Sequence, residues 1–164
     1  AYPGSPLIAQ SLLRDTDRLH LAELHPGEHA ALSRSLRAPG TNVYHADGLA
    51  LAQSLCPPTP RRGLLLVDPS YEVKSDYDTI PDALTKIRAK WNVGIVMLWY
   101  PLLEAGSHMT MLAGLPRDKA MVHEVTFAPV RPGHRMIGSG LYIANAPWGL
   151  EKELARLSTC FETL

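Results

Sequence analysis

Short apolar runs alternate with stretches of helical periodicity along the chain, and this alternation limits the fold more than any other feature. The run Gly63–Val67 contains no polar side chain, which is typical of a strand covered on both faces of a sheet. A helical pattern follows at about 80–91, and another apolar run follows at 93–99. Strands that alternate with helices form βαβ units, so the sequence predicts an α/β fold with a mostly parallel, helix-covered sheet.

The same patterns predict the remaining elements. Strands are expected at 19–24, 42–46, 121–128 and 141–144, and helices at about 6–14, 28–37, 49–55 and 103–115. A last helix is marked by Leu150, Leu154, Leu157 and Phe161, and the first, capped by Ser5, is expected to bury Leu7, Ile8, Leu12 and Leu13. Only a loop at 129–138 joins the last two strands, so they are expected to pair antiparallel at one edge.

Composition excludes several classes of protein. A chain of 164 residues is the size of one domain, and a hydrophobic content of 46% excludes wholesale disorder. The 16 basic residues balance 16 acidic ones, which is the wrong balance for holding nucleic acid by bulk charge alone. Two distant cysteines form no disulfide scaffold, the spacing of His20, His25 and His29 fits no metal motif, and no apolar stretch is long enough to span a membrane.

Ligands of such sheets bind at the carboxyl ends of the strands. The residues that follow the predicted strands are therefore the candidates for a site. They are Glu23, Asp47-Gly48, Asp68 to Tyr71, Tyr100-Pro101 and Asn145 to Trp148.

The segment Asp68-Pro69-Ser70-Tyr71 follows the most strongly apolar run. A carboxylate at the mouth of an apolar strand is costly to desolvate without a partner, which makes Asp68 a candidate site residue. With a main-chain carbonyl stiffened by Pro69, it suits the two N–H groups of a planar amine such as N6 of adenine, on which Tyr71 would stack. Asp68 is too weak a base to deprotonate a neutral amine, but it can accept the proton once nitrogen is methylated. An ordinary β-turn, with Asp first and Pro second, also explains these residues and is the commoner outcome for them.

Three further positions carry weaker signals. Glu23 stands where an acid pairs with ribose hydroxyls in nucleotide-binding folds, although a solvated acid is the common outcome there. Asp47 could accept from an adenine amine while Gly48 admits the ring, or the two could form only a turn before a helix. Ser5 marks a helix N-terminus that can receive a carboxylate, or a simple helix cap. Together these strand ends outline a pocket for an adenosine that carries a positive sulfonium.

Several motifs occur in order along the chain. They are YPGSP at 2–6, ELHP at 23–26, ADG at 46–48, RRGL at 61–64, VDPSYEVKSDY at 67–77 and LWYP at 98–101, with GSG at 138–140 and NAPW at 145–148 as sparser late anchors. This set resembles the RlmJ family, S-adenosylmethionine-dependent methyltransferases that modify N6 of one adenine in large-subunit (23S) ribosomal RNA. The resemblance runs from Tyr2 to the C-terminal helix and is densest through Tyr100.

The resemblance implies S-adenosyl-L-methionine as the cofactor, with contacts from Ser5, Glu23, Asp47, Gly48 and Asp68. It also implies that Asp68 is the catalytic acid, with Pro69 and Tyr71 as the rest of the catalytic motif. The family usually has DPPY, and Ser70 here replaces the second proline. We expect little harm from this change, because the amine contact is to the main chain. Ala146 likewise replaces a family proline, at a position with no catalytic role assigned.

The resemblance further implies a Rossmann-like methyltransferase fold with strand order 3-2-1-4-5-7-6. The family carries a histidine-rich N-terminal segment and a strand leading to a Gly-rich loop under the methionine moiety, and these residues contain neither. The chain begins at Ala1 and its first methionine is Met97, so we expect residues 1–164 to be a single methyltransferase domain, the C-terminal portion of a longer chain. The first, central strand is then missing, and the strands before Glu23 and Asp68 should not pair with each other.

The expected function is methylation of an adenine N6 in 23S rRNA, protein-free or in an early assembly intermediate, by a cytoplasmic monomer that needs no metal or membrane. Methylation of DNA adenine or of a protein glutamine is an alternative. A non-catalytic nucleic-acid-binding protein linked to the use of external DNA is another. The target base would have to leave its stack. Candidates for phosphate contacts, each otherwise an ordinary surface charge, are Arg61, Arg62, Lys74, Arg131 and Arg135.

Overall fold

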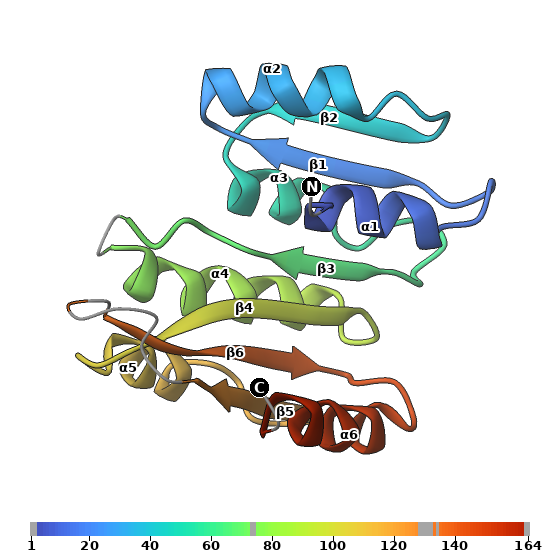
Figure 1. Cartoon of the computed structure of the whole chain (residues 1–164). Helices are drawn as coiled ribbons and strands as arrows, with labels where there is room; N and C mark the ends of the chain where they lie inside the picture. Colours follow the sequence, from blue (N-terminus) through green and yellow to red (C-terminus); the bar gives the residue numbers. More distant parts are fainter. Residues whose placement is uncertain (1–2, 73–74, 128–132, 134, 163–164) are drawn as a thin grey trace. The chain divides into compact units, whose positions relative to one another are not determined.

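The computed structural model describes residues 3–72, 75–127, 133 and 135–162. The chain divides into two compact units, unit 1 (residues 1–54) and unit 2 (residues 55–164), which are described separately. Each unit contains its own sheet, with strand order β1-β2 in unit 1 and β3-β4-β6-β5 in unit 2 (Figure 1). None of the described helices is long and apolar enough to cross a membrane.

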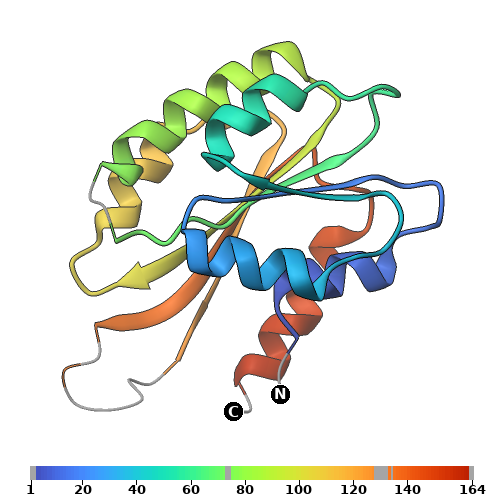
Figure 2. The ribbon, with the colours of Figure 1, turned by 90° about the horizontal axis from the view of Figure 1, so that it is seen from above.

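Unit 1 is built around one parallel pair of strands. Its elements are α1 (Ser5–Leu12), β1 (Leu19–Glu23), α2 (Pro26–Ser35), β2 (Thr41–His45) and α3 (Gly48–Leu55). The register places Glu23 beside His45 at the carboxyl ends of β1 and β2. Helices α2 and α3 lie on opposite faces of this pair (Figure 2), and α1 is tied to β2 by a hydrogen bond from Gln10 Nε2 to Thr41 Oγ1 (3.2 Å).

Helix α1 differs from the sequence-based expectation in two ways. Gly4, not Ser5, is the N-cap, and the main-chain N–H groups of Leu7 and Ile8 donate to the Gly4 carbonyl. Ser5 is therefore the first helical residue. The face expected to be buried is open, with Leu12 78% exposed and none of the helix residues buried, because no described residue of the chain covers it.

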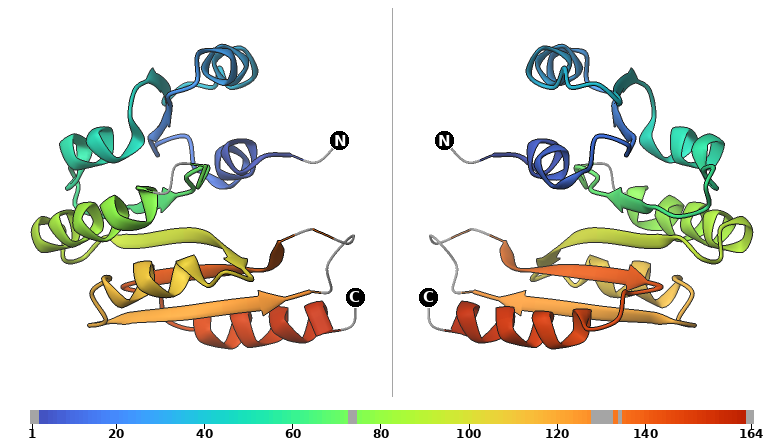
Figure 3. Two further views of the ribbon diagram at one scale, coloured as in Figure 1. Left: turned by 90° about the vertical axis from the view of Figure 1, so that its left-hand side faces the viewer. Right: turned by 90° about the vertical axis from the view of Figure 1, so that its right-hand side faces the viewer.

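Unit 2 holds a four-stranded mixed sheet with helices on both faces. Its elements are β3 (Leu64–Val67), α4 (Asp76–Lys90), β4 (Ile95–Leu103), α5 (Ser107–Ala113), β5 (Ala120–Thr126), β6 (Met136–Ala144) and α6 (Leu150–Glu162). β3 and β4 are parallel, and β6 runs antiparallel to both β4 and β5, as the sequence predicted for the last two strands. Helices α4 and α5 lie against one face of the sheet, and α6 lies along β5 on the other (Figures 2 and 3).

The core of unit 2 lies between the sheet and helix α4. Leu84 and Ile87 of α4 and Val96 and Leu98 of β4 have no exposed surface. Arg88 fastens the same helix to the sheet, because its Nη1 donates to the Tyr142 hydroxyl of β6 at 2.9 Å. Burial of complete aliphatic side chains is the main source of stability, so this layer fixes the position of β3 and β4.

β3 is less covered than the sequence predicts. Leu64 is 55% exposed and Leu66 is 40% exposed, whereas Val67 is buried. β3 is also the edge strand of its sheet. Successive side chains of a strand point to opposite faces, so Leu64 and Leu66 share one open face. The expectation of a strand covered on both faces is therefore wrong for this chain.

β4 and β6 are both longer than predicted. β4 continues through Tyr100 and Pro101 to Leu103, and β6 begins at Met136 and includes Gly138 and Gly140. A side chain at Gly140 would lie 2.2 Å from the ring of Tyr100, so glycine is required where that ring crosses the neighbouring strand. The predicted loop therefore becomes strand from Met136 onward.

The helix bounds change for related reasons. The helix expected from residue 103 begins only at Ser107, since β4 extends to Leu103 and Gly106 follows with a φ of 69°. α4 begins four residues earlier than expected, at Asp76, and contains Pro81. Acidic side chains in its first turn, Asp76 and Asp78, complement the helix dipole there.

β1 and β3 are not paired with each other in the described part of the chain. β1 pairs with β2, and β3 pairs with β4, each along one side only. This agrees with the expectation that the strands before Glu23 and Asp68 do not pair with each other.

Candidate functional site

The carboxyl ends of β3 and β4 form the candidate site of unit 2. Val67, the last residue of β3, pairs with Leu98, so the turn that begins at Asp68 follows the end of the parallel pairing. Beyond Leu98, β4 pairs with β6 and with no other described strand. The buried layer beneath β3 and β4 thus presents the turn Asp68 to Tyr71 at a rigid edge of the sheet, as predicted for Asp68.

The Asp68 carboxylate is open to solvent and receives no hydrogen bond or ion pair from the residues that the structure describes. The partial desolvation that it does experience raises the pKa of its carboxyl above the ordinary range. The two residues after it are Pro69, which is half-buried, and Ser70, which is exposed. Asp68 is therefore an uncommitted acceptor on a stiff turn.

Tyr71 makes several contacts within the protein that the sequence did not reveal. Its backbone adopts the left-handed conformation, with φ of 55°, which is uncommon for a bulky residue. Its hydroxyl donates to the main-chain carbonyl of Trp99 at 2.7 Å, and its ring packs against the rings of Tyr77 and Trp99, with centroids 5.0 and 6.1 Å away. Burial raises the pKa of the Tyr71 hydroxyl, so this group stays a donor.

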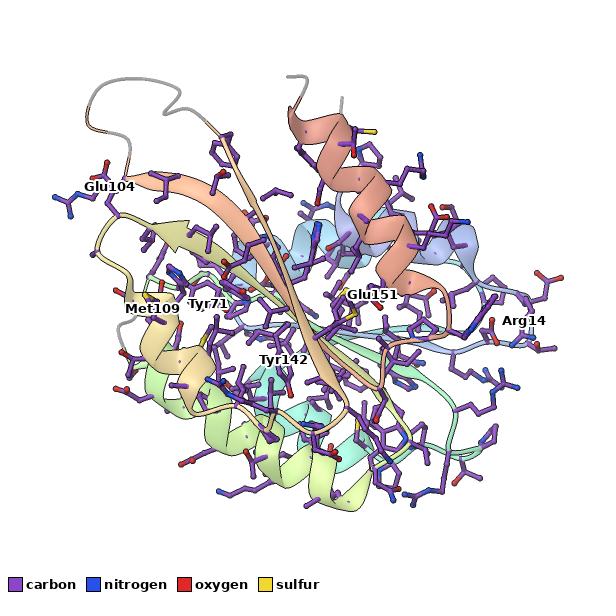
Figure 4. All side chains as sticks on the ribbon, turned by 90° about the horizontal axis from the view of Figure 1, so that it is seen from below. Arg14, Tyr71, Glu104, Met109, Tyr142 and Glu151 are labelled. Carbon is purple, nitrogen blue, oxygen red and sulfur yellow. The ribbon has the colours of Figure 1, made fainter. Side chains whose placement is uncertain are left out.

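Figure 4 shows Tyr71 on the α5 side of the sheet, in the neighbourhood of that helix. Its hydroxyl also lies 3.9 Å from the sulfur of Met111 on α5. The hydroxyl of Tyr77 is buried without a hydrogen-bond partner among the described residues. Tyr77, Trp99 and Met111 were not predicted as site residues. Trp99 and Tyr77 do lie in two of the motifs, which was the available signal.

Unit 1 presents its own set of acceptors at the carboxyl ends of β1 and β2. Glu23 Oε1 accepts from the main-chain N–H of His25 at 2.7 Å, and Asp47 Oδ1 accepts from that of Ala50 at 2.7 Å. Asp47 thus caps α3, the local role anticipated as its alternative. A side chain at Gly48 would meet only Ala22, at an ordinary 3.8 Å, so nothing in the described chain demands glycine at this position.

Ser5 lies at the start of α1 in the same unit and is exposed. The structure therefore gathers Glu23 and Asp47 at one edge of the β1–β2 pair. Asp68, Pro69 and Tyr71 form the corresponding edge of unit 2.

Two candidate strand ends are not site positions. Tyr100 is fully buried inside β4, where its hydroxyl donates to Glu124 Oε1 at 2.8 Å. Asn145 follows β6, which runs antiparallel to β4, so it lies at the amino end of β4 and not at the carboxyl end. Its Nδ2 donates to the carbonyls of Asn92 and Gly94, so its side chain holds the end of β6 to the segment that precedes β4.

The structure describes three of the five basic candidates. Arg61 donates to the carbonyl of Lys90 at 2.9 Å, and Arg62 and Arg135 are exposed. Lys74 and Arg131 lie outside the described residues. No group of three or more histidine, cysteine, aspartate or glutamate side chains suited to a metal occurs within the described ranges.

Comparison with known proteins decides the family. The chain matches the family described as Ribosomal RNA large subunit methyltransferase D, RlmJ, over residues 1–163. The chain belongs to this family. The resemblance seen in the motifs is thereby confirmed, and it extends over the sparser C-terminal third.

Two curated proteins named Ribosomal RNA large subunit methyltransferase J are similar to this chain. The Escherichia coli (strain K12) protein is 36% identical over 157 residues, which are 93% of this chain and 56% of that protein. The Haemophilus influenzae protein is 33% identical over 160 residues, which are 95% of this chain and 57% of that protein. The chain therefore spans little more than half the length of the curated relatives that it matches.

Solved structures agree with the fold. Protein LPL1258 from Legionella pneumophila str. Philadelphia 1 is 36% identical, with a TM-score of 0.87 over 99% of this chain and 60% of that one. A candidate rRNA-methylase from Clostridium thermocellum is 14% identical, with a TM-score of 0.53 over 82% of this chain and 78% of that one, and this likeness concerns the fold alone. The Rossmann-like methyltransferase fold predicted from the RlmJ resemblance is confirmed.

Proposed function

We propose that this protein transfers a methyl group from S-adenosyl-L-methionine to N6 of an adenine in large-subunit (23S) rRNA. The observation that carries the proposal is the exposed Asp68 carboxylate on the stiff turn after β3, which has no hydrogen-bond or ion-pair partner among the described residues, in a chain of the RlmJ family. Residues 1–164 act together as one catalytic domain in this proposal. The enzyme works as a cytoplasmic monomer, on protein-free 23S rRNA or on an early assembly intermediate.

The turn of unit 2 holds the amine in this proposal. Asp68 accepts one N–H of the target amine, and the main-chain carbonyl presented by Pro69 accepts the other. Two acceptors of fixed geometry favour a pyramidal nitrogen, whose lone pair is then free to attack. After the C–S bond breaks and the C–N bond forms, the methylated nitrogen is acidic, and Asp68 takes its proton.

Tyr71 forms the platform for the base in this proposal. Its ring is fixed by the hydrogen bond from its hydroxyl to the Trp99 carbonyl, so little conformational entropy is lost when a base stacks on it. The target adenine leaves its stack in the rRNA to reach this ring. Phosphate contacts from Arg61, Arg62, Lys74, Arg131 and Arg135 remain part of the proposal.

The acids of unit 1 fit the cofactor. S-adenosyl-L-methionine, when bound, supplies a methyl group on a positive sulfonium, and its adenosine carries hydroxyl and amine donors. Glu23 and Asp47 each use one carboxylate oxygen on the local main chain, so the other oxygen suits such a donor. Gly48 leaves the space beside Asp47 free of a side chain. Ser5, at the start of α1, offers its main-chain N–H and its hydroxyl to the cofactor's carboxylate.

The decisive experiment uses the full gene product that contains these residues. It measures tritium transfer from labelled S-adenosyl-L-methionine to unmodified 23S rRNA. DNA and release-factor protein serve as competing substrates. We expect labelled N6-methyladenine in the rRNA only. Label in DNA or in glutamine of the release factor would contradict the proposal and show that the labelled molecule is the substrate. Nucleic-acid binding that survives Asp68→Ala, without transfer by the parent protein, would replace it with a binding function.

A further inference from the structure

β4 extends beyond the end of β3, so the main-chain groups at its carboxyl end have no described strand beside them on the β3 side. β3 ends at Val67 opposite Leu98, whereas β4 continues to Leu103 with β6 on its other side. Main-chain groups of β4 that face the vacated side need partners from elsewhere. The carbonyl of Trp99 is the first of them, and it accepts the Tyr71 hydroxyl at 2.7 Å. Pro101, two residues further on, faces the same side and has no N–H to satisfy.

The side chain of Trp99 is held independently of its carbonyl. Its Nε1 donates to the Ser139 hydroxyl on β6 at 2.7 Å. Ser139 pairs with Pro101, so it is the diagonal neighbour of Trp99 across the strands. The hydrogen bond fixes the orientation of the indole, against which the ring of Tyr71 packs at an interplanar angle of 57°.

Tyr71 needs this support because its conformation is unfavourable. Tyr71 has a φ of 55°, and a non-glycine residue with positive φ persists only where its surroundings determine it. The carbonyl and the indole of Trp99 both act on Tyr71, which is three residues from Asp68. An indole free to rotate would loosen Tyr71 and, with it, the turn that carries the carboxylate.

We propose that Trp99, oriented by Ser139, is a positioning residue that holds Tyr71 and the Asp68 turn in their working geometry. It touches neither substrate nor cofactor and acts through Tyr71. The inference rests on the proposed function for its activity readout. It predicts a loss of kcat with little change in cofactor binding.

The test compares Ser139→Ala with Ser139→Thr in the full gene product. Threonine keeps the hydroxyl and alanine removes it, and both are tolerated in a strand. We expect Ser139→Ala to lower kcat on 23S rRNA about five- to tenfold, the effect of one lost hydrogen bond. Its KM for S-adenosyl-L-methionine should stay within about twofold, and Ser139→Thr should restore kcat. Unchanged kcat in Ser139→Ala, or equal losses in both variants, would overturn the proposal.

A double-mutant cycle separates positioning from general damage. Trp99→Phe removes the N–H donor, so Ser139→Ala should add nothing in that background. Additive losses would overturn the proposal. So would a loss in Ser139→Ala that disappears at lower temperature, where a merely destabilised protein is folded.

A readout without catalysis covers the case in which the proposed function fails. If the wild-type protein transfers no methyl group, that function is wrong, and NMR of ¹³Cζ-labelled tyrosine still tests the positioning. Tyr71 should stay protonated at about pH 11, where exposed tyrosines are ionised, in the wild type and in Ser139→Thr. In Ser139→Ala its ionisation should begin at a lower pH, shifted by up to about one unit, the equivalent of one lost hydrogen bond. A Tyr71 signal that is the same in all three would overturn the proposal.

Discussion

The two units differ sharply in how they cover their own apolar residues. Nearly all the buried hydrophobic side chains of the described chain belong to unit 2, and in unit 1 only Leu36 and Ala52 are buried. The apolar face of α1 in unit 1 is exposed instead, with Leu12 as its most open residue. The edge that carries Asp68 therefore rests on a packed core, whereas the edge that carries Glu23 and Asp47 rests on a sheet with little core of its own.

This difference suggests a division of labour within the proposed enzyme. Chemistry on the amine needs fixed geometry, and the packed unit supplies it. Cofactor binding can tolerate adjustment, and the acceptors of unit 1 are placed on the less covered sheet.

Asp68→Ala should lower methyl transfer by roughly 10²–10⁴-fold, since it removes both the amine acceptor and the proton acceptor. The fold should remain intact, because the side chain is exposed and has no partner among the described residues. Rate measurements at saturating cofactor, with Asp78→Ala on the exposed face of α4 as the matched control, check this. In unit 1, Asp47→Ala should instead weaken cofactor affinity and leave the saturated rate within a few-fold. A mutant Asp68→Ala with near wild-type turnover would contradict the role of this carboxylate.

Leu84→Ala should destabilise the protein by about 2–5 kcal/mol, because Leu84 is fully buried in the core of unit 2. Leu12→Ala in unit 1 removes the same atoms from an exposed position and should change stability by no more than about 0.5 kcal/mol. Urea unfolding of both variants measures the difference. A large loss for Leu12→Ala would show that the open face of α1 is covered in solution.

Tyr71→Ala should reduce apparent rRNA affinity or turnover about tenfold or more, through lost base stacking worth about 1–3 kcal/mol. Tyr71→Phe keeps the ring but loses the bond to the Trp99 carbonyl, and should cost a smaller part of this. Single-turnover rates on 23S rRNA for both variants check the order. Equal losses would mean that the hydroxyl contact, and not the ring, carries the effect.

The smallest effect concerns pH. Because the pKa of Asp68 is raised in the folded state, its ionisation opposes folding above the unfolded-state pKa of about 3.9. This penalty is absent below that pH and complete above the folded pKa. Asp68→Asn should therefore raise the melting temperature slightly at neutral pH and leave it unchanged near pH 3. Thermal scans at both values test the sign, and a lower melting temperature at neutral pH would reverse it.

Local patterns predicted most elements of the fold and the position of Asp68, because consecutive residues are enough to recognise an apolar strand and its end. Local patterns gave wrong strand bounds where a contact with a residue distant in sequence determines the structure. Proline and glycine are read locally as breakers, yet Pro101 lies in β4 where β3 has already ended. Gly140 lies in β6 because the Tyr100 ring crosses it. The direction of β6 likewise moved Asn145 to the opposite end of the sheet.

At the site, the sequence indicated which side chains could contact an amine. It did not indicate which of their polar groups are already hydrogen-bonded to other parts of the protein. The prediction gave a role to the ring of Tyr71 and none to its hydroxyl, which in the structure donates to the carbonyl of Trp99. That contact joins residues 28 positions apart through a main-chain carbonyl, which no residue type reveals. Whether the predicted set Asp68, Pro69 and Tyr71 works with Glu23, Asp47, Gly48 and Ser5 stays a prediction.

The corner between β6 and α6 places Trp148 in full contact with solvent, while Trp91 is buried in the core and Trp99 is partly covered beside Tyr71. These are all the indoles of the chain, and they differ in their access to water. Iodide would quench the emission of Trp148 far more than that of Trp91. With Trp148 changed to phenylalanine, the remaining quenchable fluorescence would come chiefly from Trp99, which would make the protein its own optical reporter of events beside Tyr71.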